Sequence, residues 1–276
     1  MTGHVTAPAA ALADQLPSWV TLLRAPNPGP MTLEGTNTWV LRAPGARDAV
    51  VIDPGPLDPG HLAAIVAHQP ISLILLTHGH PDHVEAVAEL AQRTEASVRG
   101  LMEGVQRPDD PPTDGELFRA AGLTITTVAT PGHTADSACF VVEGGSERAV
   151  FTGDTILGRG TTVVAHPDGD LGDYLRSLDL LSAYDDIPAL PGHGPALADC
   201  AAAARFYLAH RRARLDQVRQ AVASGARTAP DVVAAVYADV DRSLWPAAEW
   251  SVRAQLAYLD QAGRESGAGF VGLDTP

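Results

Sequence analysis

Lysine is absent from this sequence, and acidic residues outnumber basic ones. All 19 basic residues are arginine, against 33 acidic residues, and the net charge is −14. Residues 1–200 carry 10 arginines and 25 acids, a net charge of −15, whereas residues 201–276 have a net charge of +1. A field of that sign repels polyanions at long range. Because the C-terminal part is near neutral and has no basic helix face, we expect no DNA binding.

Cysteine and aromatic residues are also scarce. The two cysteines, Cys139 and Cys200, lie beside apolar residues, which excludes a disulfide framework, predicts buried thiols and fits a reducing compartment. Aromatic residues make up 5% of the chain, so stacking platforms for single-stranded nucleic acid are few. No arginine precedes Arg24, although the start of a signal peptide would require a basic residue, and no apolar run reaches about 18 residues. We therefore expect a cytoplasmic protein with no membrane partner.

What is present is an ordinary globular composition, with 45% apolar residues and many glycines and prolines for turns. Apolar runs bounded by turn residues predict strands over residues 19–23, 37–41, 49–52, 71–76, 123–128, 137–143, 148–151 and 187–190. Helical spacing is found over residues 61–68, 83–93 and 171–183. This order predicts a layered α/β sandwich over residues 1–204.

After His193 the pattern becomes helical. Residues 196–223 form one long helical stretch, Thr228 and Asp231 have the spacing of a capped helix start, and another helix is predicted from Trp245 to about residue 262. Residues 267–272 suit a short hairpin. We therefore predict a small C-terminal helical module of winged-helix type over residues 205–276.

The strongest chemical signal is the segment Thr77-His78-Gly79-His80-Pro81-Asp82-His83, placed where a buried strand ends and a helix begins. Two histidines at i and i+2 can share a metal, and the following acid and histidine can reach a second one. Three further residues follow strand-like runs and stand beside glycine, and loops at strand ends bring functional side chains together on a rigid sheet. The seven candidate ligands, too many for one tetrahedral site, are His78, His80, Asp82, His83, His133, Asp154 and His193.

This ligand order resembles the metallo-β-lactamase superfamily. The resemblance implies an αββα sandwich with a dinuclear site between its sheets, and nitrogen and oxygen ligands of this kind suit two zinc ions per chain. It implies that Asp82 and Asp154 are catalytic ligands of a site whose metal-bridging hydroxide is the nucleophile. The implied ligand sets are His78, His80 and His133 for one metal and Asp82, His83 and His193 for the other, with Asp154 bridging both.

Three segments, residues 27–38, 153–163 and 191–195, resemble a β-lactamase-like group that includes a single-strand endoribonuclease and ends in a winged-helix-like module. The resemblance implies a catalytic domain over residues 1–204 and a winged-helix-like module over residues 205–276. The favoured function is hydrolysis of a small ester, thioester or amide, β-lactam and glyoxalase II-like substrates included. Single-stranded RNA cleavage is one alternative, opposed by the acidic charge and the missing lysines. A winged-helix binding protein with a secondary metal site is another.

Residues around the candidate ligands lead to further expectations. Arg159 and Thr161, in the loop after Asp154, are predicted substrate contacts, with ordinary loop residues as the equal alternative. Asp53 either supports the ligand loop, as the resemblance implies, or forms a turn before Pro54-Gly55. Because no histidine and acid cluster follows residue 194, we expect the C-terminal module to shape access to the site. The remaining histidines, His4, His61, His68, His166 and His210, are predicted to lie on the surface.

Overall fold

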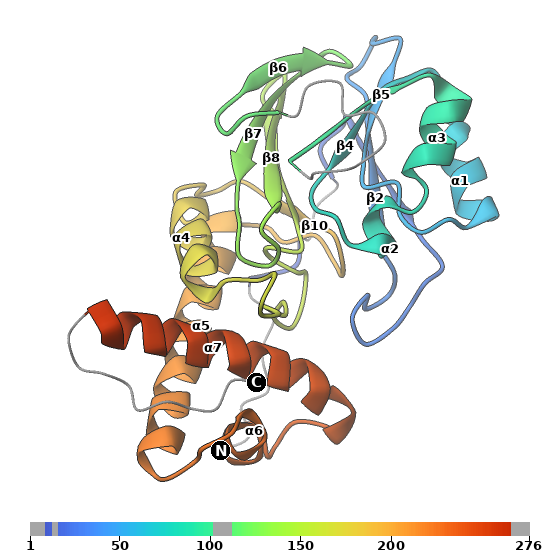
Figure 1. The fold of residues 1–276 in the computed structure, drawn as a ribbon. Coiled ribbons are helices and arrows are strands. Elements are labelled where there is room, and N and C mark those ends of the chain that lie inside the picture. The colour runs from blue at the N-terminus through green and yellow to red at the C-terminus, as the bar shows by residue number, and fades with distance from the viewer. Residues whose placement is uncertain (1–8, 13–15, 102–111, 266–276) are drawn as a thin grey trace.

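The computed structural model describes residues 9–12, 16–101 and 112–265, in which two mixed sheets pack face to face (Figure 1). One sheet has the strand order β1 (Val20–Arg24), β2 (Asn37–Leu41), β3 (Ala49–Ile52), β4 (Ile71–Leu76), β5 (Ser97–Gly100). The other has the order β10 (Ala189–Pro191), β9 (Glu147–Gly153), β8 (Ala138–Gly144), β7 (Leu123–Ala129), β6 (Leu117–Ala120). Strands β3, β4 and β5 run parallel, as do β9 and β10, and the other pairs are antiparallel.

Each sheet is covered on its outer face by helices, which gives the predicted αββα layers. Helices α1 (Pro59–Val66) and α3 (Val87–Thr94) cover the first sheet, and α4 (Leu171–Leu181) and α5 (Cys200–Ala223) pack on the second. Along β2, Trp39 and Leu41 join the core between the sheets, whereas Val40 joins the core under α1 and α3. Burial of both faces explains why these strands are continuous apolar runs.

Two predicted helices differ from the observed ones. The helix expected over residues 83–93 is divided into α2 (Pro81–Val84) and α3, because the Ala86 N–H donates to the Gly55 carbonyl and the Gly55 N–H donates to the His83 carbonyl. The helix expected from residue 196 begins at Cys200, because Leu197 still pairs with Ala189 of β10. Strands β5 and β6 were not predicted, since they are short and only partly apolar.

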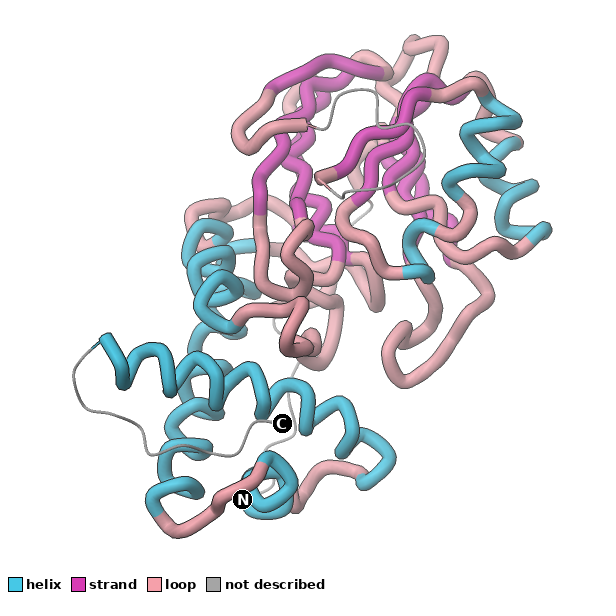
Figure 2. Tube along the Cα trace, in the orientation of Figure 1, coloured by secondary structure: helices cyan, strands magenta, loops and turns pink. Residues whose placement is uncertain are grey.

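The C-terminal helices lie beside the sandwich, below it in Figures 1 and 2, and continue its core. They are α5, α6 (Ala229–Val236), the short 3-10 helix η1 (Arg242–Leu244) and α7 (Trp245–Glu265). Leu215 and Val218 of α5 share a buried cluster with Val232 and Val252. Thr228 caps α6 in a full capping box with Asp231, as predicted.

Other predictions concern the C-terminal hairpin, the domain boundary, membrane-spanning helices and the cysteines. The hairpin expected over residues 267–272 lies outside the described residues. The boundary predicted between residues 204 and 205 falls within α5 and stays a prediction. Among the described helices, none is both long and apolar enough to cross a membrane. Cys139 and Cys200 are both buried and unpaired, as predicted.

Candidate metal centre

The fold brings all seven predicted ligand residues together at one end of the sandwich. His78 and His80 follow β4, and Asp82 and His83 lie in the short helix α2 directly after them. The other three residues each follow the C-terminal end of a strand: His133 after β7, Asp154 after β9 and His193 after β10. Four strand ends of two sheets therefore supply one cluster.

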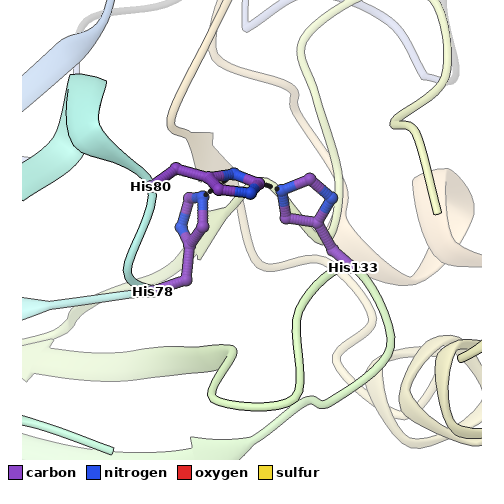
Figure 3. A group of neighbouring side chains, drawn as sticks. All are labelled: His78, His80 and His133. Carbon is purple, nitrogen blue, oxygen red and sulfur yellow. Dashed lines mark hydrogen bonds between the residues drawn. The ribbon is translucent and has the colours of Figure 1, made fainter. Parts of the chain in front are cut away.

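Three imidazole rings converge in the first half of this cluster. The Nε2 of His78 lies 3.0 Å from the Nδ1 of His80, and the Nε2 of His133 lies 3.1 Å from the same His80 nitrogen. Figure 3 shows the three rings pointing toward one another from the β4 end and the loop after β7. Ring nitrogens this close together could hold one metal ion.

The second half of the cluster contains carboxylates as well as imidazoles. The Nε2 of His193 lies 3.2 Å from that of His83 and 3.2 Å from Oδ2 of Asp82. Asp154 lies between the halves: its Oδ2 is 3.4 Å from His193 Nε2 and 3.8 Å from His133 Nε2. Asp82, His83 and His193 form a second group whose donor atoms all lie within 4.8 Å of one another.

The outer nitrogens of these histidines are held by protein acceptors. Asp53 accepts a hydrogen bond from His83 Nδ1 at 2.8 Å and from the Thr77 hydroxyl at 2.7 Å. Since the Thr77 hydroxyl donates to Asp53, its oxygen accepts from His78 Nδ1 at 3.0 Å. The Val163 carbonyl accepts from His133 Nδ1 at 2.7 Å. These bonds hold Nδ1 of each ring on the outside and direct Nε2 of the three rings into the cluster.

Asp53 therefore takes the supporting role that the resemblance implied. It is 1% exposed and has φ 51°, and its second oxygen accepts the Thr77 backbone N–H at 2.8 Å. Sequence reasoning missed Thr77 and Asn37. The Asn37 side chain donates to the carbonyls of Pro191 and Gly194 on both sides of His193. The three polar residues Thr36-Asn37-Thr38 at the start of an apolar strand were the available signal.

Electrostatics differ between the two halves of the cluster. Burial lowers the pKa of His78 well below its usual value and also lowers that of His133. Burial opposes protonation of His83 and His193 too, but neighbouring carboxylates, Asp154 first, outweigh it and raise both pKa values, that of His193 to about 10. Burial would raise the pKa of Asp154, yet His193 and His83 hold it well below its usual range. Burial thus favours the neutral form of His78 and His133 in one half, whereas the other half contains ionised carboxylates.

Glycine is required where the backbone passes closest to the cluster. A Cβ atom on Gly192 would lie 2.5 Å from Asp154 Oδ1 and 2.7 Å from His83 Cε1. A Cβ atom on Gly153, whose φ is 48°, would lie 2.6 Å from the side chain of Thr77. Both positions therefore exclude any larger residue. The glycines beside Asp154 and His193 therefore allow the backbone to pack closely against the cluster.

A cavity of about 380 Å³ opens beside His133 and Asp154. Arg159 and Thr161, the predicted substrate contacts, both line it, and Arg159 is also paired with Glu34 at 2.5 Å. Residues of α5, α7 and the segment between α6 and η1 also line it, so the C-terminal part borders the site as expected. Its helix α5 also supports the loop after β9, because the Tyr207 hydroxyl accepts the Leu157 N–H at 3.0 Å.

The other histidines follow the sequence predictions only in part. His166 is exposed, as predicted, and His68 is half-buried. His61 was predicted on the surface, which is wrong: it is 5% exposed and bonds the Thr38 hydroxyl at 2.8 Å, because α1 packs this side onto the sheet. His210 was also predicted on the surface, but it is half-buried and lines the cavity. His4 lies outside the described residues.

The sequence matches known protein families. The chain matches the Metallo-beta-lactamase superfamily over residues 31–103 and 96–193, and the Beta-lactamase associated winged helix domain over residues 228–265. It is 35% identical over 251 residues to a lactamase-like protein of Penicillium aethiopicum, covering 86% of this chain and 79% of that protein. It is 34% identical over 230 residues to an atrochrysone carboxyl ACP thioesterase of Aspergillus chevalieri, covering 78% of this chain and 72% of that protein.

Solved structures agree with the sequence matches. A metallo-beta-lactamase family protein from Thermus thermophilus superposes with a TM-score of 0.73 at 26% identity, covering 92% of this chain and 96% of that one. Both the α/β sandwich and the C-terminal helices thus have counterparts in known proteins. The chain belongs to the metallo-beta-lactamase superfamily and carries the winged helix domain associated with it.

Proposed function

We propose that this superfamily hydrolase is a dinuclear zinc enzyme that cleaves a small thioester, or a related ester or amide. The observation that carries the proposal is the direction of the imidazole lone pairs. His78, His83 and His133 each turn Nδ1 outward to a protein acceptor, so their Nε2 atoms all face into the cluster. A cation is the natural occupant of such a cluster.

The donor set fits two zinc ions. His78, His80 and His133 would hold one, Asp82, His83 and His193 the other, and Asp154 would contact both. Oδ1 of Asp154 is buried and has no hydrogen-bond partner among the described residues, which is costly for a carboxylate unless a cation accompanies it. When bound, zinc supplies Lewis acidity and lowers the pKa of a water to near neutrality, which suits hydrolysis at a carbonyl carbon.

The protein's own residues orient these ligands and limit access. Asp53 and Val163 set the ring orientations, and the Thr36 hydroxyl donates to Asp82 Oδ2 at 3.3 Å, which fixes that carboxylate. In the cavity, Leu157 and Val163 provide apolar walls beside His133, where an acyl group would displace water. Arg159 and Thr161 stand at the same wall as candidate substrate contacts.

Two observations favour a thioester over RNA as the substrate. A relative that aligns with 78% of this chain is named an acyl carrier protein thioesterase. The charge of −15 on residues 1–200, together with the lack of lysine, disfavours a polyanion such as RNA. Because salt screens the repulsion between the acidic protein and RNA, RNA is included among the substrates tested.

The test compares substrates on protein of known metal content. We expect elemental analysis to find about two zinc ions per chain, and chelation to abolish hydrolysis that two equivalents of zinc then restore. An acyl thioester, an aryl ester, a β-lactam and a single-stranded oligoribonucleotide should be assayed side by side, with the thioester cleaved fastest. Protein that takes up no metal, or that cleaves the oligoribonucleotide faster than every acyl substrate, would overturn the proposal.

A further inference from the structure

Basic side chains on the wall of the cavity beside the metal centre outnumber acidic ones. Its walls hold three basic side chains of helix α5: His210, Arg211 and Arg214. Among the described residues, the only acid on its walls is Asp154, which is a candidate metal ligand. In a chain with a net charge of −14, a cavity of this composition is unusual and calls for a physical reason.

Arg211 is the one arginine that is fully buried among the described residues, with 4% of its surface exposed. Its guanidinium lies over the Tyr174 ring, 5.2 Å from the centroid, and Nη2 donates to the Thr162 carbonyl. Its Nε–H is buried without a hydrogen-bond partner in the described residues. A buried cation with an unused donor, on the wall of a cavity, is suited to an anionic or strongly polar ligand.

Arg214 stands one helical turn further along the same wall. It donates to the Val236 carbonyl at 2.8 Å and lies over the Tyr237 ring at 4.7 Å. Neither Arg211 nor Arg214 forms an ion pair in the part of the chain described here, whereas exposed arginines of the same helix, such as Arg205 and Arg219, pair with aspartates. The two guanidinium charges facing the cavity are thus left uncompensated by the protein.

His210 completes this cluster as an uncharged donor. Burial, followed by the charges of Arg211 and Arg214, lowers the pKa of His210 to about 4, so the ring is neutral at physiological pH. Its Nδ1 is buried without a hydrogen-bond partner among the described residues. An arginine and a histidine that are neighbours in α5 and line the same cavity therefore each keep a buried polar atom without a partner among the described residues.

Much of the rest of the cavity wall is apolar. The loop before β2 contributes Met31 and Leu33, and the C-terminal helices contribute Leu244 and Ala248. Met31 is 49% exposed and Leu244 is 37% exposed, so two large apolar side chains that line the cavity also reach solvent. A ligand that fills it has an apolar stem between these walls.

We propose that the cavity selects a thioester or ester whose apolar stem ends in an anionic group, and that Arg214, Arg211 and His210 bind that group. This inference rests on the proposed function for the identity of the reacting bond. The shared chemistry is an oxyanion at a distance from the cleaved carbonyl. It comes either from a carboxylate at the far end of the acyl chain or from a phosphate on the thiol leaving group.

The first experiment separates the two sources by changing one part of the substrate at a time. The neutral reference is the hexanoyl thioester of N-acetylcysteamine. The adipoyl thioester of the same thiol adds a terminal carboxylate, and the hexanoyl thioester of phosphopantetheine adds a phosphate to the leaving group. We expect kcat/KM of the zinc-loaded protein to be higher for one charged substrate than for the reference by about tenfold or more.

Variants then assign the preference to the arginine. Arg214→Gln should reduce the charged-to-neutral ratio of kcat/KM by about tenfold, and Arg214→Lys should retain part of it because the charge is kept. Arg219→Gln, on the exposed side of the same helix, is the matched control and should leave the ratio unchanged. Equal kcat/KM for all three substrates in the unmodified protein, or an unchanged ratio in Arg214→Gln, would overturn the inference.

A binding measurement keeps this inference distinct from the proposed hydrolysis. Calorimetry with adipate and with inorganic phosphate, on zinc-loaded protein, should show binding of at least one anion that Arg214→Gln weakens and Arg219→Gln does not. That result supports the anion site even if no thioester is cleaved, in which case only the proposed function fails. Binding that is equal in Arg214→Gln and the unmodified protein would place the anion elsewhere and overturn the inference.

Discussion

Asp154 and Asp82 are both carboxylates of the cluster, but they differ in position. Asp154 is 9% exposed and lies within 4 Å of histidines from both halves, whereas Asp82 is partly exposed and its histidine neighbours among the described residues, His83 and His193, belong to one half. We therefore predict that Asp154→Ala lowers the metal content and the hydrolysis rate more than Asp82→Ala does. Elemental analysis and initial rates of the two variants check this. Loss of one metal from each variant alike would show that Asp154 does not contact both ions.

His210 leads to a prediction about pH. Its pKa is about 4 in the folded protein and about 6.5 in an unfolded chain, so between these values only the unfolded chain binds the proton. The free energy of unfolding should therefore fall as the pH drops from 6.5 to 4. In His210→Gln this fall should be smaller by about 1–2 kcal/mol, a figure that allows for solvent screening of a half-buried group. Denaturant titrations of both proteins across this range measure the difference, and parallel curves would contradict it.

Helix α5 supports the loop between Asp154 and Val163, whose carbonyl accepts a hydrogen bond from His133. Tyr207 accepts the Leu157 N–H, and Arg211 donates to the Thr162 carbonyl next to Val163. Tyr207→Phe would leave the buried Leu157 N–H without its acceptor, and we predict a loss of about 1–3 kcal/mol in the free energy of unfolding. Denaturant unfolding measures this loss.

The matched control is Tyr258→Phe in α7, because the Tyr258 hydroxyl has no hydrogen bond among the described residues. That variant should change the free energy of unfolding by less than about 0.5 kcal/mol. If both variants lose the same stability, the hydroxyl of Tyr207 is not what holds the loop.

At the scale of the whole molecule, the C-terminal part has two separable roles. Ending the chain after residue 225 removes α6 and α7, which exposes apolar residues of α5 and opens the cavity, but it keeps Tyr207 and Arg211. Ending it after residue 204 removes these two residues as well. We predict that the longer protein has lower solubility but keeps its zinc, and that the shorter protein also loses zinc.

Zinc content of the soluble fractions, with turnover of a small and a large acyl thioester, checks both halves of this prediction. In the protein ending at residue 225, the ratio of turnover between the large and the small thioester should change, because only the cavity wall has changed. Equal zinc content in the two truncated proteins would show that α5 does not support the metal centre.

Much of the fold and the ligand set could be predicted because the signals are local. The buried strands are continuous apolar runs, and His78 through His83 share one strand end and one helical turn, so their proximity follows from chain geometry alone. Thr228 capped its helix as predicted, since a cap depends on residues three positions apart. The division of α2 from α3 was missed because Gly55, some 30 residues away, takes the hydrogen bond of Ala86.

The sequence by itself determined which residue types stand at the strand ends, and therefore the ligand chemistry and the superfamily. Only the tertiary structure decided how those ligands are oriented, because Asp53 and Val163 reach them from other segments. The cavity with its arginines was likewise beyond the sequence. Arg211 and Arg214 follow no chemical motif, and their burial arises from packing of α5 against loops that lie about 50 residues earlier in the chain. Local patterns fix chemistry over a few residues, whereas a binding cavity is produced by contacts between distant ones.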